Sequence, residues 1–103
     1  MDTKPGASPI AASAADVDAW RELFAEARRR VPADAGCEAE WAGFRAHVRG
    51  MLGRLMGCRG EMEPRAWTAR RIALARIEFE GFAGDPALAR AALDRDEPTF
   101  GGA

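Results

Sequence analysis

Residues 38–57 read EAEWAGFRAHVRGMLGRLMG, and this stretch decides which fold the chain can adopt. On a helix, where successive residues are rotated by about 100°, its large apolar side chains fall on one side. These side chains are Trp41, Phe44, Val48, Met51, Leu52 and Leu55. We therefore predict an amphipathic helix over residues 38–56, with one side that packs against other helices.

The opposite side of this predicted helix carries only small residues, which we call the small-residue stripe. Spaced three and four residues apart, they are Gly43, Ala46, Gly50, Gly53 and Gly57. A glycine inside a helix costs about 1 kcal/mol relative to alanine. A closely packed partner would explain this cost, because small residues let two backbones approach. The alternative is that codon bias scattered the glycines and that residues 50–60 form a frayed loop.

Two other segments have the sequence features of a helix. Residues 14–30 follow Ser13, a candidate N-cap, and end before Pro32, which cannot continue a helix. Residues 86–95 are short and rich in alanine, and Asp85 before them is a suitable N-cap. Both segments are therefore expected to form helices, one long and one short.

Residues 64–81 have apolar side chains on two sides of a predicted helix. One sector holds Ala66, Ala73, Leu74 and Ile77, and the other holds Ile72, Ala75, Phe79 and Phe82. A helix that is apolar on two sides is usually enclosed by neighbours. We therefore predict that this helix is the central one of the fold.

The four segments predict an all-α fold, because the chain is rich in alanine, poor in valine and isoleucine, and has no tyrosine. We expect a small helical bundle of three main helices and a short fourth, in a single domain over residues 13–97. Residues 1–12 are predicted to be a disordered tail and residues 98–103 a flexible one. A body of about 80 residues is marginal without added support, so we expect a homodimer.

Composition and hydropathy indicate where the chain works. The bias toward alanine and arginine, with a single lysine, is typical of a GC-rich bacterial or phage genome. No apolar run is long enough to span a membrane, and the first residues have no continuous apolar segment of a secretory signal. We therefore predict a cytoplasmic protein in which Cys37 and Cys58 are free thiols.

Sulfur and imidazole groups suggest a metal site at first, but their spacing does not support one. His47 and Cys58 would lie about 16 Å apart along a continuous helix, and His47 with Met51 makes only an incomplete site. The sequence has no motif of paired cysteines or histidines and no glycine-rich phosphate loop. No carboxylate or nucleophile is spaced to act with His47. We predict no metal, no cofactor and no catalytic activity.

Charge is segregated along the chain. Residues 41–76 carry eight arginines and only two glutamates, whereas residues 1–40 and 77–103 are both acidic. A basic block of this kind can bind phosphates. The candidate nucleic-acid-binding residues are Arg45, Arg49, Arg59, Arg65, Arg70 and Arg71. The alternative is that the arginines pair with the acidic segments, within one chain or across a dimer.

These patterns favour a binding protein over an enzyme. We predict a non-catalytic helical protein–protein interaction module that acts as a small regulator, inhibitor or accessory factor of a larger protein. Its predicted binding residues are those of the small-residue stripe together with Arg54. A small nucleic-acid-binding regulatory protein that uses the basic block is the alternative.

Overall fold

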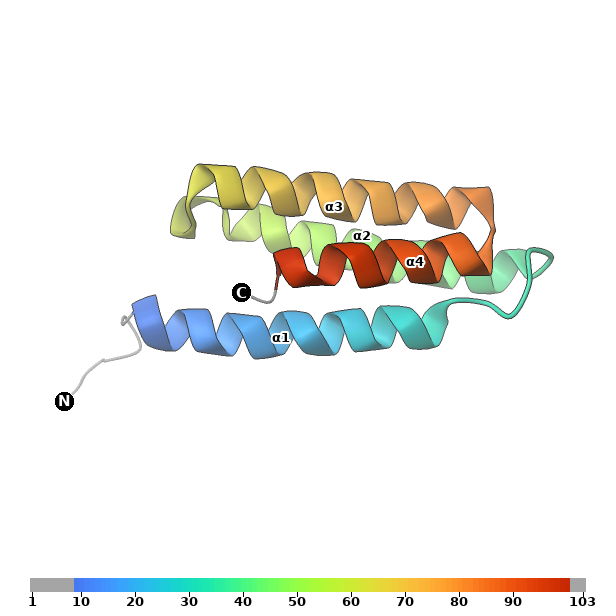
Figure 1. Ribbon diagram of the computed structural model, residues 1–103, viewed down its shortest axis with the longest axis horizontal. Helices are drawn as coiled ribbons and strands as arrows, with labels where there is room; N and C mark the ends of the chain where they lie inside the picture. The colour runs from blue at the N-terminus through green and yellow to red at the C-terminus, as the bar shows by residue number, and fades with distance from the viewer. Residues whose placement is uncertain (1–8, 101–103) are drawn as a thin grey trace.

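Four α-helices run up, down, up and down along one long axis (Figure 1). The computed structural model describes the backbone of residues 9–100 and the side chains of residues 17–100. The helices are α1 (Pro9–Arg30), α2 (Glu38–Gly57), α3 (Pro64–Ala83) and α4 (Pro86–Asp96), with short 3₁₀ helices η1 (Arg59–Glu61) and η2 (Glu97–Thr99). The predicted all-α helical bundle is therefore confirmed over the part of the chain that the structure describes.

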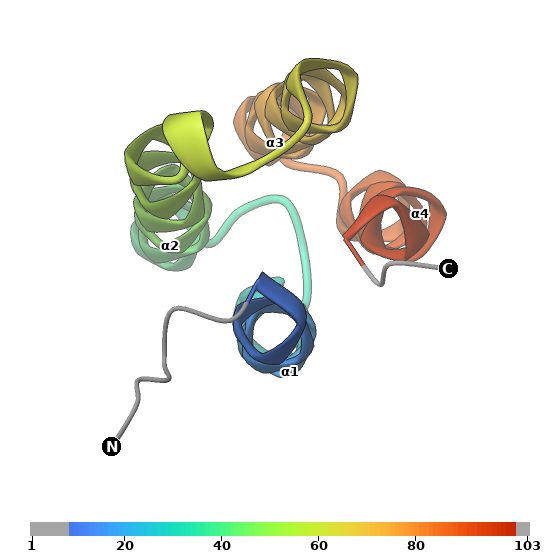
Figure 2. The same ribbon diagram turned by 90° about the vertical axis from the view of Figure 1, so that its left-hand side faces the viewer.

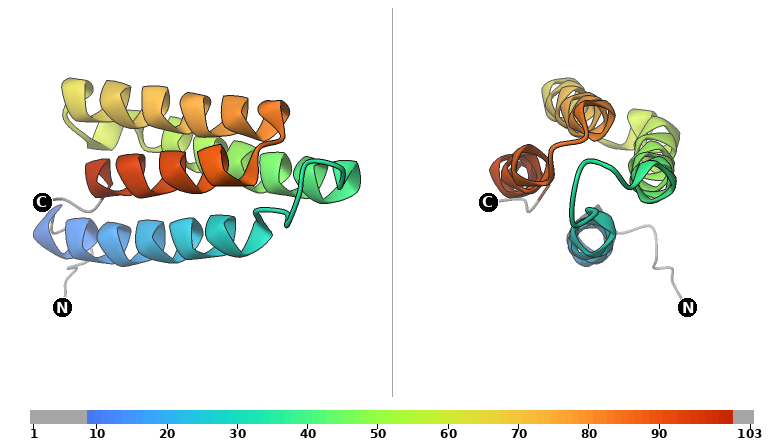
Figure 3. Two further views of the ribbon diagram at one scale, coloured as in Figure 1. Left: turned by 45° about the vertical axis from the view of Figure 1, so that its right-hand side comes forward. Right: turned by 90° about the vertical axis from the view of Figure 1, so that its right-hand side faces the viewer.

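The helices occupy the corners of a square when the bundle is viewed along its axis (Figures 2 and 3). Helix α1 lies diagonally across from α3, and α2 lies diagonally across from α4. The connections are short, which favours antiparallel packing of helices that are neighbours in sequence. The most extensive contact in the bundle is the one between α2 and α3.

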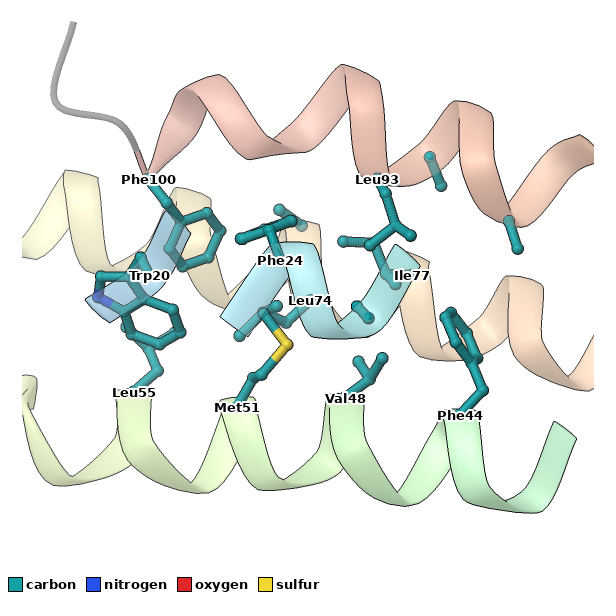
Figure 4. Close-up of a cluster of buried hydrophobic side chains, with 14 of the residues drawn as sticks. Trp20, Phe24, Phe44, Val48, Met51, Leu55, Leu74, Ile77, Leu93 and Phe100 are labelled. Atoms are coloured by element: carbon teal, nitrogen blue, oxygen red, sulfur yellow. The ribbon is translucent and has the colours of Figure 1, made fainter. Parts of the chain in front are cut away.

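The core forms where the apolar sides of the helices meet. The apolar side predicted for residues 38–56 is confirmed, because Trp41, Phe44, Val48, Met51 and Leu55 are buried and Leu52 is partly buried. Figure 4 shows the core side chains of α2 pointing toward side chains from the other three helices. Helix α2 is therefore held along its whole length by burial of apolar surface.

Local signals in the sequence set the ends of α3 and α4. The Glu63 carboxylate accepts a hydrogen bond from the Ala66 N–H at 2.9 Å, at the start of α3. Gly84 ends α3 with φ at 71°, a left-handed conformation that favours glycine. Asp85 then caps α4 by accepting a hydrogen bond from the Ala87 N–H at 2.9 Å. The N-cap predicted at Asp85 is confirmed.

Two helices extend further than the sequence patterns indicated. Helix α1 begins at Pro9, so Ser13 lies inside the helix and part of the predicted tail 1–12 is helical. Proline is well suited to the first position of a helix, and the alanines after it favour helix. Residues 1–8 lie outside the described residues. Helix α2 continues to Gly57, so the frayed-loop alternative is wrong at residues 50–57.

The end of the chain contributes to the core, contrary to the flexible tail predicted for residues 98–103. Phe100 is only 1% exposed. Its ring centroid lies 4.7 Å from that of Trp20 and 5.0 Å from that of Phe24. The 3₁₀ helix η2 follows α4 and contacts α3 and α4, and Phe100 directly after it packs on the two aromatic side chains of α1. Residues 101–103 lie outside the described residues.

Helix α3 is not enclosed on two sides, so the prediction of a central helix is wrong within the described chain. Ala73, Leu74 and Ile77 of its first apolar sector are buried. Side chains of the second sector face outward, with Phe79 70% exposed and Phe82 61% exposed. A corner position in the bundle leaves the outer side of α3 without a neighbouring helix (Figure 2).

The indole N–H groups of the three buried tryptophans differ in their hydrogen bonding. Trp67 Nε1 donates a hydrogen bond to the Leu55 carbonyl at 2.8 Å, and Trp41 Nε1 donates one to the Asp34 carbonyl at 3.0 Å. Trp20 Nε1 is buried and finds no acceptor among the residues that the structure describes. Trp20 and Trp67 therefore differ in one hydrogen bond.

Replacing Trp67 by phenylalanine is expected to lower the free energy of unfolding more than the same change at Trp20. Both changes leave a similar void, but Trp67→Phe also removes a buried hydrogen bond, whereas Trp20→Phe removes a donor that has no acceptor. From the usual cost of such groups we expect a difference of about 1–2 kcal/mol. Urea unfolding measures it. Equal losses, or a larger loss in Trp20→Phe, would contradict the assignment.

Candidate protein-interaction surface

The outer side of α3 carries a regular row of exposed side chains, which we call the α3 stripe. Its members are Thr68, Ile72, Ala75, Phe79 and Phe82. They are spaced four, three, four and three residues apart, which is the heptad spacing by which one helix packs against another. Ile72 is 45% exposed, in addition to the two strongly exposed phenylalanines. The stripe is therefore a largely exposed apolar side of the helix.

A groove of about 440 Å³ runs along this side of the molecule. Its apolar lining comes from Leu52 of α2 and from Ile72, Ala75 and Phe79 of α3. Its charged lining comes from Arg71, Arg76, Glu80 and Arg95. An apolar centre bordered by charged groups is the usual composition of a protein-binding surface.

Arg45 supports the end of the stripe at Phe82. Its guanidinium carbon lies 4.5 Å from the centroid of the Phe82 ring, a cation–π contact. The same group donates a hydrogen bond to the Gly81 carbonyl at 3.2 Å and forms an ion pair with Glu38 at 2.9 Å. Only 15% of the Arg45 side chain is exposed, so this arginine is committed to holding α2 and α3 together.

A buried carboxylate fixes two of the arginines beside the groove. Asp96 is 3% exposed and accepts hydrogen bonds from Arg76 at 3.2 Å and from Arg95 at 3.1 Å. The hydrogen bond to Asp96 raises the pKa of Arg95 above its ordinary value. These two positive charges are therefore neutralised in part and held in place, which limits their use for binding phosphate.

The small-residue stripe of α2 also faces outward. A Cβ atom added at Gly43, Gly50, Gly53 or Gly57 would meet nothing within 4 Å, and Ala46 is exposed. The predicted partner-binding glycines therefore share one exposed side of α2, but no part of the described chain packs against them. Arg54 lies on the same side of α2, at helical spacing from Gly50 and Gly57, and its guanidinium carbon is 5.8 Å from the Trp20 ring of α1.

The glycine that allows a close helix contact is Gly81, and the sequence patterns did not predict this packing role. A Cβ atom there would lie 2.8 Å from Arg45 Cγ, which is too close, and 3.0 Å from Phe44 Cδ2, which is an unusually tight contact. Gly81 follows Leu74 and Ile77 at helical spacing, and it is buried with them. That spacing is the signal that could have identified it.

Several arginines of the basic block are used inside the molecule. Arg49 forms an ion pair with Glu78 at 2.6 Å, and Arg76 forms one with Asp96, so both pair with the acidic segment 77–103. Arg45 pairs with Glu38 of the other acidic segment. These three arginines of the basic block therefore pair with acidic residues of the same chain.

The remaining predicted nucleic-acid-binding residues are spread over the end of the bundle near η1 and over α3. Arg59 lies 5.0 Å from the centroid of the Trp67 ring, and Arg70 lies 5.1 Å from that of Phe100 and donates to the Thr99 carbonyl. Arg65 and Arg71 are exposed, and neither forms an ion pair with a described side chain. Two of these four arginines, Arg59 and Arg70, are therefore held against aromatic rings.

The groups considered for metal or thiol chemistry have structural roles. His47 Nε2 donates a hydrogen bond to the Leu23 carbonyl at 2.9 Å. The Cys37 thiol donates to the Asp34 carboxylate at 3.4 Å, which raises the pKa of that thiol and disfavours the reactive thiolate. Cys37 and Cys58 are not joined in a disulfide. Among the described residues, no three His, Cys, Asp or Glu side chains gather closely enough to hold a metal ion.

Comparison with known proteins does not assign this chain to a family. No protein-family model, no curated protein and no solved structure matches it. Within residues 9–100, none of the helices has the length and apolar character needed to cross a membrane.

Two matched glycine substitutions separate an exposed stripe from a packed contact. Gly50→Ala is expected to raise the free energy of unfolding by about 1 kcal/mol, because alanine favours helix and the new methyl group has room. Gly81→Ala is expected to lower it by about 1–3 kcal/mol, because the methyl group overlaps Arg45 and Phe44. Urea unfolding measures both. A loss of stability in Gly50→Ala would mean that something covers the small-residue stripe in solution.

Proposed function

We propose that this protein is a non-catalytic helical protein–protein interaction module and that the α3 stripe is its binding surface. The observation that carries the proposal is the exposure of Phe79 and Phe82, at 70% and 61%, on one side of one helix. A module of this kind acts as a small regulator, inhibitor or accessory factor. Each of these roles works by covering part of another protein and needs no catalytic group. The absence of a disulfide between Cys37 and Cys58 suits a cytoplasmic protein.

The chemistry of the stripe supports a protein partner. Large apolar side chains that gather on one exposed patch are typical of binding surfaces, because water contact with them is unfavourable. Aromatic residues also contribute most of the binding energy at many interfaces. The heptad spacing of the stripe fits a helix as the bound element. A protein helix is therefore the partner that this surface suits best.

Nucleic-acid binding is the second candidate. It is supported by four arginines, Arg54, Arg59, Arg65 and Arg71, that form no ion pair with a described side chain. It is weakened by the ring contacts of Arg54 and Arg59 and by the acidic total charge. Its test is a gel shift with DNA and with RNA at low salt, where phosphate contacts are strongest. A shift that weakens steeply with salt would support it over the protein-binding proposal.

The substitution Phe79→Asp is expected to abolish partner binding while leaving the fold intact. Phe79 is largely exposed, so its replacement removes little core packing, but a charge at the centre of an apolar interface typically weakens binding by more than tenfold. Tagged protein expressed in the source cells is cross-linked, and the bound proteins are quantified by mass spectrometry. Helix content measured by circular dichroism confirms that the variant folds.

The matched control for this experiment is Leu88→Asp. Leu88 is also apolar and is 50% exposed, but it lies on α4 and does not line the groove. Proteins that depend on the α3 stripe should be lost in Phe79→Asp and retained in Leu88→Asp. Recovery of the same proteins with both variants, in the same amounts, would overturn the proposed binding surface.

A further inference from the structure

We propose that the helix bound by the α3 stripe is α3 of a second copy of the chain, packed antiparallel about a two-fold axis. This inference rests on the proposed function and names the partner for that surface. The axis passes the middle of α3, between Ala73 and Leu74, so that the helices overlap from Pro64 to Ala83. A two-fold interface uses the same patch on both copies, so the patch must be complementary to itself.

The apolar side chains of the stripe meet this requirement. In the central antiparallel register, Ile72 of one copy lies opposite Ala75 of the other, and Phe79 lies opposite Thr68. Each large side chain therefore faces a smaller one, which is the arrangement that lets two helices pack closely. Both pairs occur twice, because the two-fold axis repeats each of them. The exposed phenylalanines are covered without any change in the bundle.

The charges beside the stripe are complementary in the same register. Arg71 of one copy lies opposite Glu78 of the other, and the pair occurs twice. Arg71 is exposed and forms no ion pair with a described side chain. Both hydrogen bonds from Arg49 to Glu78 end on Oε2, and 18% of the Glu78 side chain is exposed. Charges in these flanking positions set the orientation of paired helices.

The end of the helix adds a further complementary pair. Arg65 of one copy lies opposite Phe82 of the other in the central register. Arg65 is exposed at the start of α3, and Phe82 already binds one guanidinium group, that of Arg45. An arginine over the exposed part of the ring is a favourable cation–π contact. This pair also occurs twice in the dimer.

A parallel arrangement of the two helices is disfavoured by the same residues. It would place Phe79 against Phe79 and Ala75 against Ala75, so that large side chains meet large ones. It would also place Arg71 of one copy beside Arg76 of the other, a contact between like charges. The antiparallel dimer is therefore the arrangement that both the apolar and the charged residues support.

The test is a charge exchange read out by sedimentation equilibrium of the full chain. The wild type is expected to be a dimer, and Arg71→Glu and Glu78→Arg are each expected to raise the dimer dissociation constant by about tenfold or more. The double variant with both changes, made together with Arg49→Glu so that position 78 keeps its ion pair with α2, should regain dimer formation, because the exchanged charges again face each other. Arg90→Glu, a charge reversal at an exposed site on α4, is the control and should have no effect.

Each outcome decides a different part of the inference. A wild type that stays monomeric at the highest concentration reached overturns the second copy as partner, and loss of other proteins in Phe79→Asp then still supports the proposed function. A dimer that Phe79→Asp does not weaken overturns the α3 stripe as the binding surface. A dimer that Phe79→Asp abolishes, but in which the double charge variant is no better than the single ones, overturns the antiparallel central register.

Discussion

The contact of Gly81 with Phe44 and Arg45 determines how α3 lies on α2, and the exposed surface depends on it. Without a Cβ atom at Gly81, the two helices approach closely at this point. Arg45 of α2 can then donate a hydrogen bond to the Gly81 carbonyl. One turn before Gly81 in α3, Glu78 accepts hydrogen bonds from Arg49 of α2. Once this side of α3 is fixed against α2, Ile72 and its neighbours in the α3 stripe must point away from the bundle.

The sequence predicted best the features that depend on nearby residues. The apolar side of residues 38–56 is confirmed because five of its six large side chains are buried, and burial of such a side is what stabilises a helix in a small protein. The cap at Asp85 is likewise a matter of one side chain and the N–H groups that follow it. Such signals need no knowledge of the rest of the fold.

Features that depend on distant parts of the chain were missed. Periodicity shows that two sides of α3 are apolar, but it does not show whether a second helix covers both, and here only one side is covered. Phe100 has no periodic pattern around it, and its burial follows only from the return of the chain toward Trp20 and Phe24. The small-residue stripe attracted attention through its number of glycines, whereas the single close contact belongs to Gly81.

The segregation of charge along the chain has a structural explanation that does not require nucleic acid. The antiparallel order of the helices brings the basic residues of α2 and α3 beside the acidic residues of α3 and α4, where Arg49 meets Glu78 and Arg76 meets Asp96. Opposite charges in successive segments therefore pair where neighbouring helices meet. Arg71 is basic in the same block yet has no such partner among the described residues, and it borders the apolar groove. An unpaired charge beside an exposed apolar stripe is what an interface between proteins uses to fix orientation.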